Sequence, residues 1–265
     1  MLDKRNIIRG IRNPALALVL FRRWFPWNAK RKDRECAHLI SAWSSGRLHR
    51  VKIQEVFPGI EECSVVVRQP EARVVGWSLD LQELVHILAA MKLMTVKRVL
   101  EIGTYDGFTA LNLAANVALG GEVCTVDLPQ DDDESVLRAQ GMSNACISRE
   151  IGSKYRGQPE AEYIRQLWGD SKRVDWLQFG APFDLILIDG CHDYSYVESD
   201  SLNAIKHVRA GGTVFWHDYG QSFDVSRAVD AVAKKYPVKA ILGTRLACLR
   251  MPSVSVKDES ESPQY

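Results

Sequence analysis

The sequence predicts a doubly wound α/β domain, in which a mostly parallel sheet of seven strands is covered by helices. Apolar runs alternate with amphipathic stretches from Asp80 onward, and the run FDLILI at 183–188 is apolar almost throughout. Such a run is typical of a parallel strand covered on both faces. Only Gly243 and Thr244 separate the last two strand-like runs, too few residues for a parallel crossover. The sheet is therefore expected to end in an antiparallel hairpin.

The first helix of the series is expected to begin near Asp80, which forms a capping box with Glu83. Its apolar stripe is Leu81, Leu84, Val85 and Leu88. Strands are expected at 98–102, 122–126, 163–167, 183–189, 213–216, 238–242 and 245–250. A second helix is expected at 109–118. A third is expected from the apolar stripe Val197, Ser201, Ile205 and Val208, and should end at Gly211 and Gly212. A fourth is expected from the stripe Val225, Ala228, Val229 and Val232.

Three segments are expected along the chain. Residues 1–75 show no clear periodicity and include FRRWFPWNAKRKDRE at 21–35, which suits an accessory segment for substrate binding or oligomerisation. It would pack as an arm on the core or on another subunit of a homo-oligomer; a substrate lid or a membrane-surface contact are the alternatives. Residues 76–252 form the main domain, and the polar tail at 253–265 is expected to be disordered.

Composition narrows the function classes. Hydrophobic residues at 46% and charged residues at 25% are typical of a folded globular protein, and a net charge of +1 gives no reason to expect a nucleic-acid partner. The six cysteines include no C-x-x-C pair, so reduced thiols in a cytoplasmic protein are expected. The early apolar stretch at 15–21 is far shorter than the ~20 residues of a membrane span, so no stable membrane insertion is expected.

Polar residues follow the first two strands of the series, where ligands bind in open α/β sheets. The loop EIGTYDG at 101–107 has only Gly103 and Gly107, whereas a dinucleotide site has three glycines. Asp106 would also repel a phosphate. Asp127 ends the second strand, where a carboxylate can accept both hydroxyls of an adenosine ribose. A turn or helix-capping aspartate is the alternative for Asp127.

At these residues the chain resembles a known family. VLEIGTYDGFTALNLA looks like motif I of class I S-adenosylmethionine-dependent methyltransferases, which have a Rossmann-like sheet with an antiparallel last strand. WGDS, FDLILIDGCHDYSYVESD and GGTVFWHDY resemble the small-molecule O-methyltransferase branch, of the macrolide-sugar and catechol type. The resemblance implies that Glu101, Gly103 and Tyr105 contact the methionine portion of the cofactor, that Asp127 holds the ribose, and that Asp170 and Ser171 lie near the adenine. The expected cofactor-binding residues are Glu101, Gly103, Thr104, Tyr105, Gly107, Asp127, Asp170, Ser171 and Asp189.

Two carboxylates are expected at the opposite part of the same rim, because Asp189 and Asp218 end neighbouring strands. They could bind Mg²⁺, which would orient an acceptor hydroxyl. Metal-dependent relatives carry acidic ligands at these positions but place a third ligand where this chain has Tyr219. His217 or Asp193 could compensate, so the use of Mg²⁺ stays open.

His192, three residues after Asp189, is the expected catalytic base, as in macrolide-sugar methyltransferases, and Asp189 is the second catalytic residue. The alternative for His192 is a cap on the helix that begins near Tyr194. His217 could be a pocket wall, a hydrogen-bonding post or a base. Glu198 and Asp200 are expected on a solvated helix face, with Tyr194 and Tyr196 as pocket walls.

The expected function is methyl transfer from S-adenosylmethionine to a hydroxyl of a small-molecule acceptor, a sugar or a secondary metabolite. Two alternatives remain at the level of sequence. One is an NAD-linked oxidoreductase, which the missing third glycine and Asp106 disfavour. The other is a noncatalytic cofactor-binding module that docks a partner or a membrane surface. The motifs do not identify the acceptor.

Overall fold

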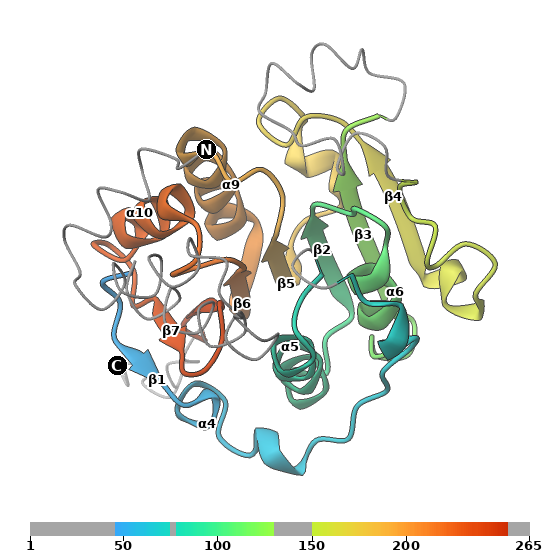
Figure 1. Cartoon of the computed structure of the whole chain (residues 1–265), viewed down its shortest axis with the longest axis horizontal. Helices are drawn as coiled ribbons and strands as arrows, with labels where there is room; N and C mark the ends of the chain where they lie inside the picture. Colours follow the sequence, from blue (N-terminus) through green and yellow to red (C-terminus); the bar gives the residue numbers. More distant parts are fainter. Residues whose placement is uncertain (1–45, 75–77, 130–149, 254–265) are drawn as a thin grey trace, which may run out of the picture.

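A computed structural model of the chain describes residues 46–74, 78–129 and 150–253 (Figure 1). Its centre is an eight-stranded sheet with the order β1-β7-β8-β6-β5-β2-β3-β4. The seven predicted strands are all present, and a two-residue strand, β1, adds an eighth. The strands are β1 (Arg50–Val51), β2 (Arg98–Ile102), β3 (Glu122–Asp127), β4 (Ile164–Trp168), β5 (Phe183–Ile188), β6 (Val208–Trp216), β7 (Lys239–Ile241) and β8 (Ala247–Arg250).

The predicted hairpin is confirmed at the end of the chain. β8 pairs antiparallel with β7 and also with β6, whereas every other pair of neighbouring strands is parallel. β8 therefore lies inside the sheet with reversed direction, so that it begins at the edge where the parallel strands end. Trp216, the last residue of β6, pairs with Ala247, the first residue of β8.

Helices cover both faces of the sheet, and alternate residues of β5 contact opposite layers. Leu185 and Leu187 belong to one hydrophobic cluster, and Ile186 and Ile188 to another. The first cluster lies under α5 (Leu81–Met94) and α6 (Phe108–Ala114), and the second under α9 (Tyr194–His207) and α10 (Phe223–Val232). Figure 1 shows α9 and α10 together on one side of the sheet and α5 on the other. The shorter helices are α4 (Ile53–Val56) and 3-10 turns at Ile60–Glu62, Pro70–Ala72, Pro159–Tyr163 and Trp176–Phe179.

The predicted end of the helix before β6 is wrong. α9 ends at His207, and β6 begins directly at Val208. Gly211 and Gly212 lie instead in an irregular stretch of β6, where the register against β5 shifts between Phe183 and Leu185. A Cβ atom on Gly212 would lie 2.7 Å from Val208 Cγ2. The second glycine is therefore required by this close approach within the strand.

Part of the N-terminal segment is attached to the domain core. β1 pairs parallel with β7 at the edge of the sheet. Further along, Asn112 of α6 and Asn116, just after this helix, bond to the N-terminal segment as a neighbouring strand would. Their side-chain oxygens accept hydrogen bonds from the amides of Arg68 (2.7 Å) and Val66 (2.9 Å). Their side-chain nitrogens donate back to the carbonyls of the same two residues.

Two segments singled out in the sequence lie outside the described residues: the aromatic and basic run at 21–35, and the tail from 254 onward. Among the described residues, no helix is both long enough and apolar enough to cross a membrane. The four cysteines described there, Cys63, Cys124, Cys191 and Cys248, are free thiols.

Candidate active site

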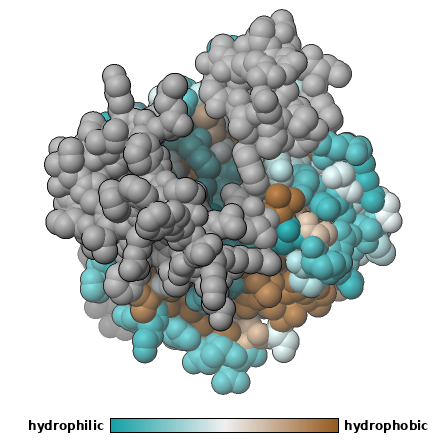
Figure 2. All heavy atoms as spheres, in the orientation of Figure 1, coloured by the Kyte–Doolittle hydropathy of each residue, from teal (hydrophilic) through white to brown (hydrophobic). Residues whose placement is uncertain are grey.

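The carboxyl ends of β2, β3, β5 and β6 meet at one edge of the sheet. Figure 2 shows a recessed, hydrophilic surface at the centre of the molecule, in the region where these strands end. The loops after β2 and β5 touch there, because the Asp189 amide donates to the Ile102 carbonyl (2.9 Å). A Cβ atom on Gly103 would lie 2.3 Å from the Asp189 carbonyl oxygen. The glycine turn and the predicted catalytic rim are therefore adjacent.

Glu101 in β2 is a fully buried carboxyl group with an unused acceptor. The Thr125 hydroxyl donates to its Oε2, whereas Oε1 has no hydrogen-bond partner among the described residues. Burial raises the pKa of Glu101 well above its usual range, and the negative charges of Asp189 and Asp127 raise it further. A cationic ligand group beside Oε1 would satisfy the acceptor and offset this charge. Glu101 therefore fits the ammonium group of an amino-acid ligand.

The loop after Glu101 has the backbone of a tight turn. Gly103, Tyr105 and Gly107 have φ values of 100°, 49° and 83°, the left-handed region that glycine adopts without strain. Thr104 is buried, and its hydroxyl lies 2.7 Å from that of Thr125. Asp106 accepts a hydrogen bond from the Phe108 amide (3.0 Å) at the start of α6. Asp106 therefore stabilises the turn into the helix.

Asp127 joins two loops at the end of β3. Its Oδ2 accepts from the Tyr105 amide (2.9 Å), and its Oδ1 accepts from the Leu128 amide (2.8 Å). The turn-aspartate alternative is thus present in the structure. Each carboxylate oxygen has a second lone pair, so these bonds do not exclude ribose hydroxyls as additional donors.

The residues after β4 form a separate polar turn. Asp170 accepts hydrogen bonds from the Lys172 amide (3.0 Å) and from the Tyr196 hydroxyl (3.2 Å), and the Ser171 carbonyl accepts from the Trp176 indole (3.0 Å). The turn is therefore held against α9 by Tyr196.

The prediction for Asp200 is wrong. Glu198 is exposed, as expected, but Asp200 is 1% exposed. Asp200 lies on the face of α9 that turns toward the Asp170 turn. Burial raises its pKa to about 7, and the negative charge of Asp170 adds to the effect.

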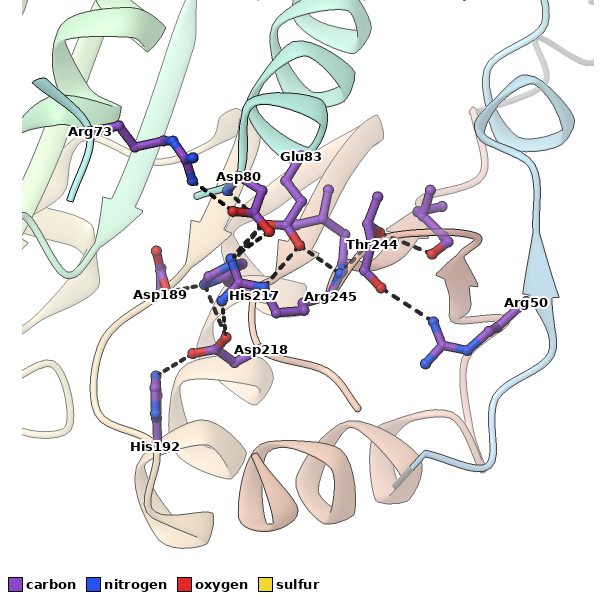
Figure 3. Close-up of polar contacts among 12 residues, drawn as sticks. Arg50, Arg73, Asp80, Glu83, Asp189, His192, His217, Asp218, Thr244 and Arg245 are labelled. Atoms are coloured by element: carbon purple, nitrogen blue, oxygen red, sulfur yellow. Dashed lines mark hydrogen bonds and ion pairs between the residues drawn. The ribbon is translucent and has the colours of Figure 1, made fainter. Parts of the chain in front are cut away.

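The other half of the rim contains a buried network of acids and bases (Figure 3). His217, which follows β6, is 3% exposed. Its Nδ1 lies 2.8 Å from Asp189 Oδ1, and its Nε2 lies 3.1 Å from Glu83 Oε2. Burial alone would lower the pKa of His217, but the surrounding carboxylates raise it well above the usual value. His217 is therefore a hydrogen-bonding post in its protonated form rather than a base.

Glu83 is the centre of this network on the side of α5. The predicted capping box is confirmed, because the Asp80 amide donates to Glu83 Oε2 (2.8 Å). The same carboxylate also accepts hydrogen bonds from the Arg245 backbone amide (2.7 Å) and guanidinium (2.8 Å). Burial alone would raise the pKa of Glu83, but His217 and Arg245 lower it to about 2. Glu83 is therefore an ionised carboxylate in the core.

Asp218 links the network to the surface. Arg245 Nη1 donates to its Oδ1 (3.0 Å), and His192 Nε2 lies 3.1 Å from its Oδ2. Burial alone would raise the pKa of Asp218, but the neighbouring cations hold it well below the usual range. An ionised carboxylate only accepts hydrogen bonds, so His192 must carry a proton on Nε2. In the neutral imidazole, Nδ1 is then the atom that can accept a proton.

His192 is placed for contact with a ligand. Its side chain is 51% exposed, whereas the Asp218 side chain behind it is 9% exposed. The capping alternative is excluded, because the N-cap residue of α9 is Asp193. Burial alone would lower the pKa of His192, but its bond to Asp218 and the charge of Asp189 raise it above the usual value. This geometry is compatible with the hydrogen-bonding arrangement that a general base requires.

The candidate metal ligands also lie together at this rim. Asp189, His192 and Asp218 each offer a ligand atom within 4.8 Å of the others. Both Asp218 oxygens and Asp189 Oδ1 are already hydrogen-bonded to basic side chains, which would have to give way to an ion. Tyr219, at the expected third position, is fully buried, and its hydroxyl donates to Asp230 (2.7 Å). The donor set is assembled, but its carboxylate oxygens already contact basic side chains of the chain itself, so Mg²⁺ does not fit it as it stands.

Two members of the network, Glu83 and Arg245, were not predicted from the sequence. Glu83 was assigned only to the capping box, and Arg245 only to a strand. A topological signal was available for both. α5 leads into the start of β2, so its first turn lies at the carboxyl edge of the sheet, and the reversed strand β8 begins at that same edge.

A model of a methyltransferase domain matches residues 100–219. Caffeoyl-CoA O-methyltransferase 2 of Populus trichocarpa is 22% identical over 209 residues, covering 77% of this chain and 79% of the relative. The caffeoyl-CoA O-methyltransferase of Petroselinum crispum is 22% identical over 213 residues, with 79% and 83% covered.

Solved structures share the fold. The methyltransferase PaMTH1 of Podospora anserina, solved with S-adenosylhomocysteine (SAH), has a TM-score of 0.52 at 15% identity and covers 86% of this chain and 98% of its own. Cofactor-bound Rv0187 from MTB has a TM-score of 0.50 at 19% identity, with 69% and 85% covered.

Proposed function

Because the chain carries a class I S-adenosylmethionine-dependent methyltransferase domain, we propose that it methylates a hydroxyl oxygen of a small-molecule acceptor. One observation carries this proposal: the exposed imidazole of His192, backed by Asp218, stands at the same rim as the turn formed by Gly103. The O-methyltransferase names of the curated relatives support the choice of oxygen as the acceptor atom. A sugar or a polyphenolic metabolite is the proposed acceptor class.

The cofactor half of the proposal uses the loops after β2, β3 and β4. The unpartnered Oε1 of Glu101 accepts from the ammonium group, and the remaining lone pairs of Asp127 accept from the ribose hydroxyls. The turn of Gly103, Thr104, Tyr105 and Gly107 lies against the methionine portion. Asp170 and Ser171 line the adenine end. S-adenosylmethionine supplies a methyl group on a cationic sulfur when it is bound.

The catalytic half uses His192 as the proton acceptor. Nδ1 of the neutral ring takes the proton of the acceptor hydroxyl, while Asp218 keeps the Nε2 proton in a hydrogen bond. The ring becomes an imidazolium, and the carboxylates of Asp218 and Asp189 stabilise this charge. Placement of the reacting groups contributes the larger share of the rate, on the order of 7 to 11 kcal/mol at best.

The experiment that tests the proposal is transfer of an isotope-labelled methyl group. The full chain would be incubated with labelled S-adenosylmethionine and a panel of sugars, sugar nucleotides and polyphenols, and products identified by mass spectrometry. The proposal expects a methyl ether on a hydroxyl of one class, and a rate at least about 10²-fold lower for His192→Ala. Binding of SAH without transfer to any member of the panel would instead favour a noncatalytic cofactor-binding module.

A further inference from the structure

Arg245 reaches the candidate site from the turn between β7 and β8. It is 7% exposed. Its guanidinium donates to Glu83 through Nε (3.1 Å) and Nη2 (2.8 Å), and to Asp218 through Nη1 (3.0 Å). Figure 3 shows the guanidinium between Glu83 and Asp218. One side chain thus connects the buried end of the network with the carboxylate that holds His192.

The network contains two fixed cations. A guanidinium is always protonated in proteins. The two ring nitrogens of His217 each face a carboxylate oxygen, at 2.8 Å to Asp189 and 3.1 Å to Glu83. Both nitrogens must donate in this geometry, which only the protonated ring can do. The carboxylates of Glu83, Asp189 and Asp218 therefore contact two cations of the chain itself, Arg245 and His217.

These cations occupy the contacts that a divalent ion would use. Magnesium needs near-octahedral oxygen ligands at about 2.0–2.1 Å. Asp218 Oδ1 is already bonded to Arg245, and Asp189 Oδ1 to His217. An ion bound there would have to displace these hydrogen bonds and lie beside two like charges among buried side chains.

We propose that Arg245 serves as an internal cation in place of a divalent metal ion, so that this centre works without one. The inference rests on the proposed methyl transfer and deepens it. Arg245 is a positioning residue: its guanidinium holds Asp218 in the orientation that keeps the Nε2 proton of His192 directed at Oδ2. The acceptor hydroxyl is then activated by His192 alone, and its proton moves to Nδ1.

The test is direct binding of Mn²⁺ to the full chain in the absence of S-adenosylmethionine. Binding is measured by electron paramagnetic resonance as a loss of the signal of the free ion. Wild-type protein is expected to leave the signal of millimolar Mn²⁺ unchanged. Arg245→Met removes the guanidinium, exposes the carboxylates to the ion, and is expected to raise Mn²⁺ affinity by about tenfold or more, the scale on which groups beside a metal site change its affinity. Arg245→Lys keeps the charge and should behave as wild type.

The matched control is Arg250→Met. Arg250 is the last residue of β8, and its guanidinium donates to the Val56 carbonyl and lies over the Phe57 ring, away from the network. This variant should not gain Mn²⁺ binding. If Arg245→Met does not fold, as judged by circular dichroism, Mn²⁺ binding by the wild-type and Asp189→Asn proteins still tests the inference. One Mn²⁺ bound by wild type and lost in Asp189→Asn overturns the inference, and absence of binding in both supports it.

A second experiment distinguishes failure of this inference from failure of the proposed function. Once an acceptor is known, methyl transfer should be unchanged by a chelator and by added Mg²⁺. Loss of transfer in the chelator with recovery in Mg²⁺ overturns the internal-cation inference but leaves methyl transfer intact. Failure to bind SAH, together with no Mn²⁺ binding, would refute the proposed function while the assignment of Arg245 as the cation of the network stands.

Discussion

His192 Nε2 lies 3.1 Å from Asp218 Oδ2, so that an exposed imidazole is held by a buried carboxylate. The carboxylate fixes the tautomer of the ring, because an ionised acid can only accept a hydrogen bond. It also raises the pKa of His192 above the usual value. Both effects prepare Nδ1 to take a proton from a hydroxyl, and both can be tested.

The rate of methyl transfer should fall as the pH is lowered. Only the neutral ring of His192 can act as a base, so the rate under saturating substrate should follow a single ionisation above the usual pKa of about 6.5 for histidine. Asp218→Asn removes the charge that raises this pKa and should move the acidic limb to lower pH, with a lower plateau. Initial rates between pH 5 and 9 measure both effects. An acidic limb that is identical in Asp218→Asn would show that another group is titrating.

Asp127→Ala should weaken cofactor binding and leave the sheet folded. The loss combines the proposed ribose contacts with the hydrogen bonds to the amides of Tyr105 and Leu128, which position the loop. Two lost hydrogen bonds to a charged group correspond to about 3 kcal/mol or more, roughly 10²-fold in affinity. Calorimetric titration with SAH measures this change. Unchanged affinity would remove Asp127 from the cofactor site.

Asp200→Asn should change how stability depends on pH. Burial raises the pKa of Asp200 to about 7 in the folded protein, whereas the unfolded chain releases this proton near the usual aspartate pKa of 3.8. The folded state therefore binds more protons between these values, and wild-type stability is lost as the pH rises through this window. The asparagine side chain does not titrate, so the variant should not lose this stability. The difference in free energy of unfolding amounts to at most about 4 kcal/mol, at 1.36 kcal/mol per pKa unit. Urea unfolding of both proteins at pH 4 and pH 8 tests it, and parallel pH profiles would contradict it.

Gly103→Ala should destabilise the fold by more than backbone strain alone. The position has a φ of 100°, and the new Cβ atom would lie 2.3 Å from the Asp189 carbonyl oxygen. Gly120→Ala is the matched control, because Gly120 has a φ of 74° and nothing within 4 Å of its Cβ position. A substitution that only strains the backbone costs more than about 1 kcal/mol. Equal losses in free energy of unfolding for the two variants would show that the loop after β2 moves aside.

The order of strands and helices was predictable because it depends on local periodicity. The apolar run that forms β5 and the short connection before β8 were enough to indicate the parallel core and the reversed strand, although the connection is longer than the two residues predicted. The boundary between α9 and β6 was not predictable, because it depends on how closely Gly212 approaches Val208. That contact exists only in the folded sheet.

The candidate site was predictable as far as it follows from strand ends. Asp127 and Asp189 lie where their strands predicted, and His192 has the exposure that a base requires. The partners of these residues come from elements distant in sequence, and residue type alone does not reveal them. Arg245 illustrates this, since it reaches Glu83 across 162 positions of the chain. The buried state of Asp200 escaped prediction because a charged residue on a helix is usually exposed.

The central claim is that the rim of this sheet binds S-adenosylmethionine rather than a dinucleotide. Isothermal titration of the full chain with SAH and, separately, with NAD⁺ tests it most directly. The account predicts one SAH bound per chain and no measurable heat with NAD⁺. Saturable binding of NAD⁺ with no binding of SAH would contradict it.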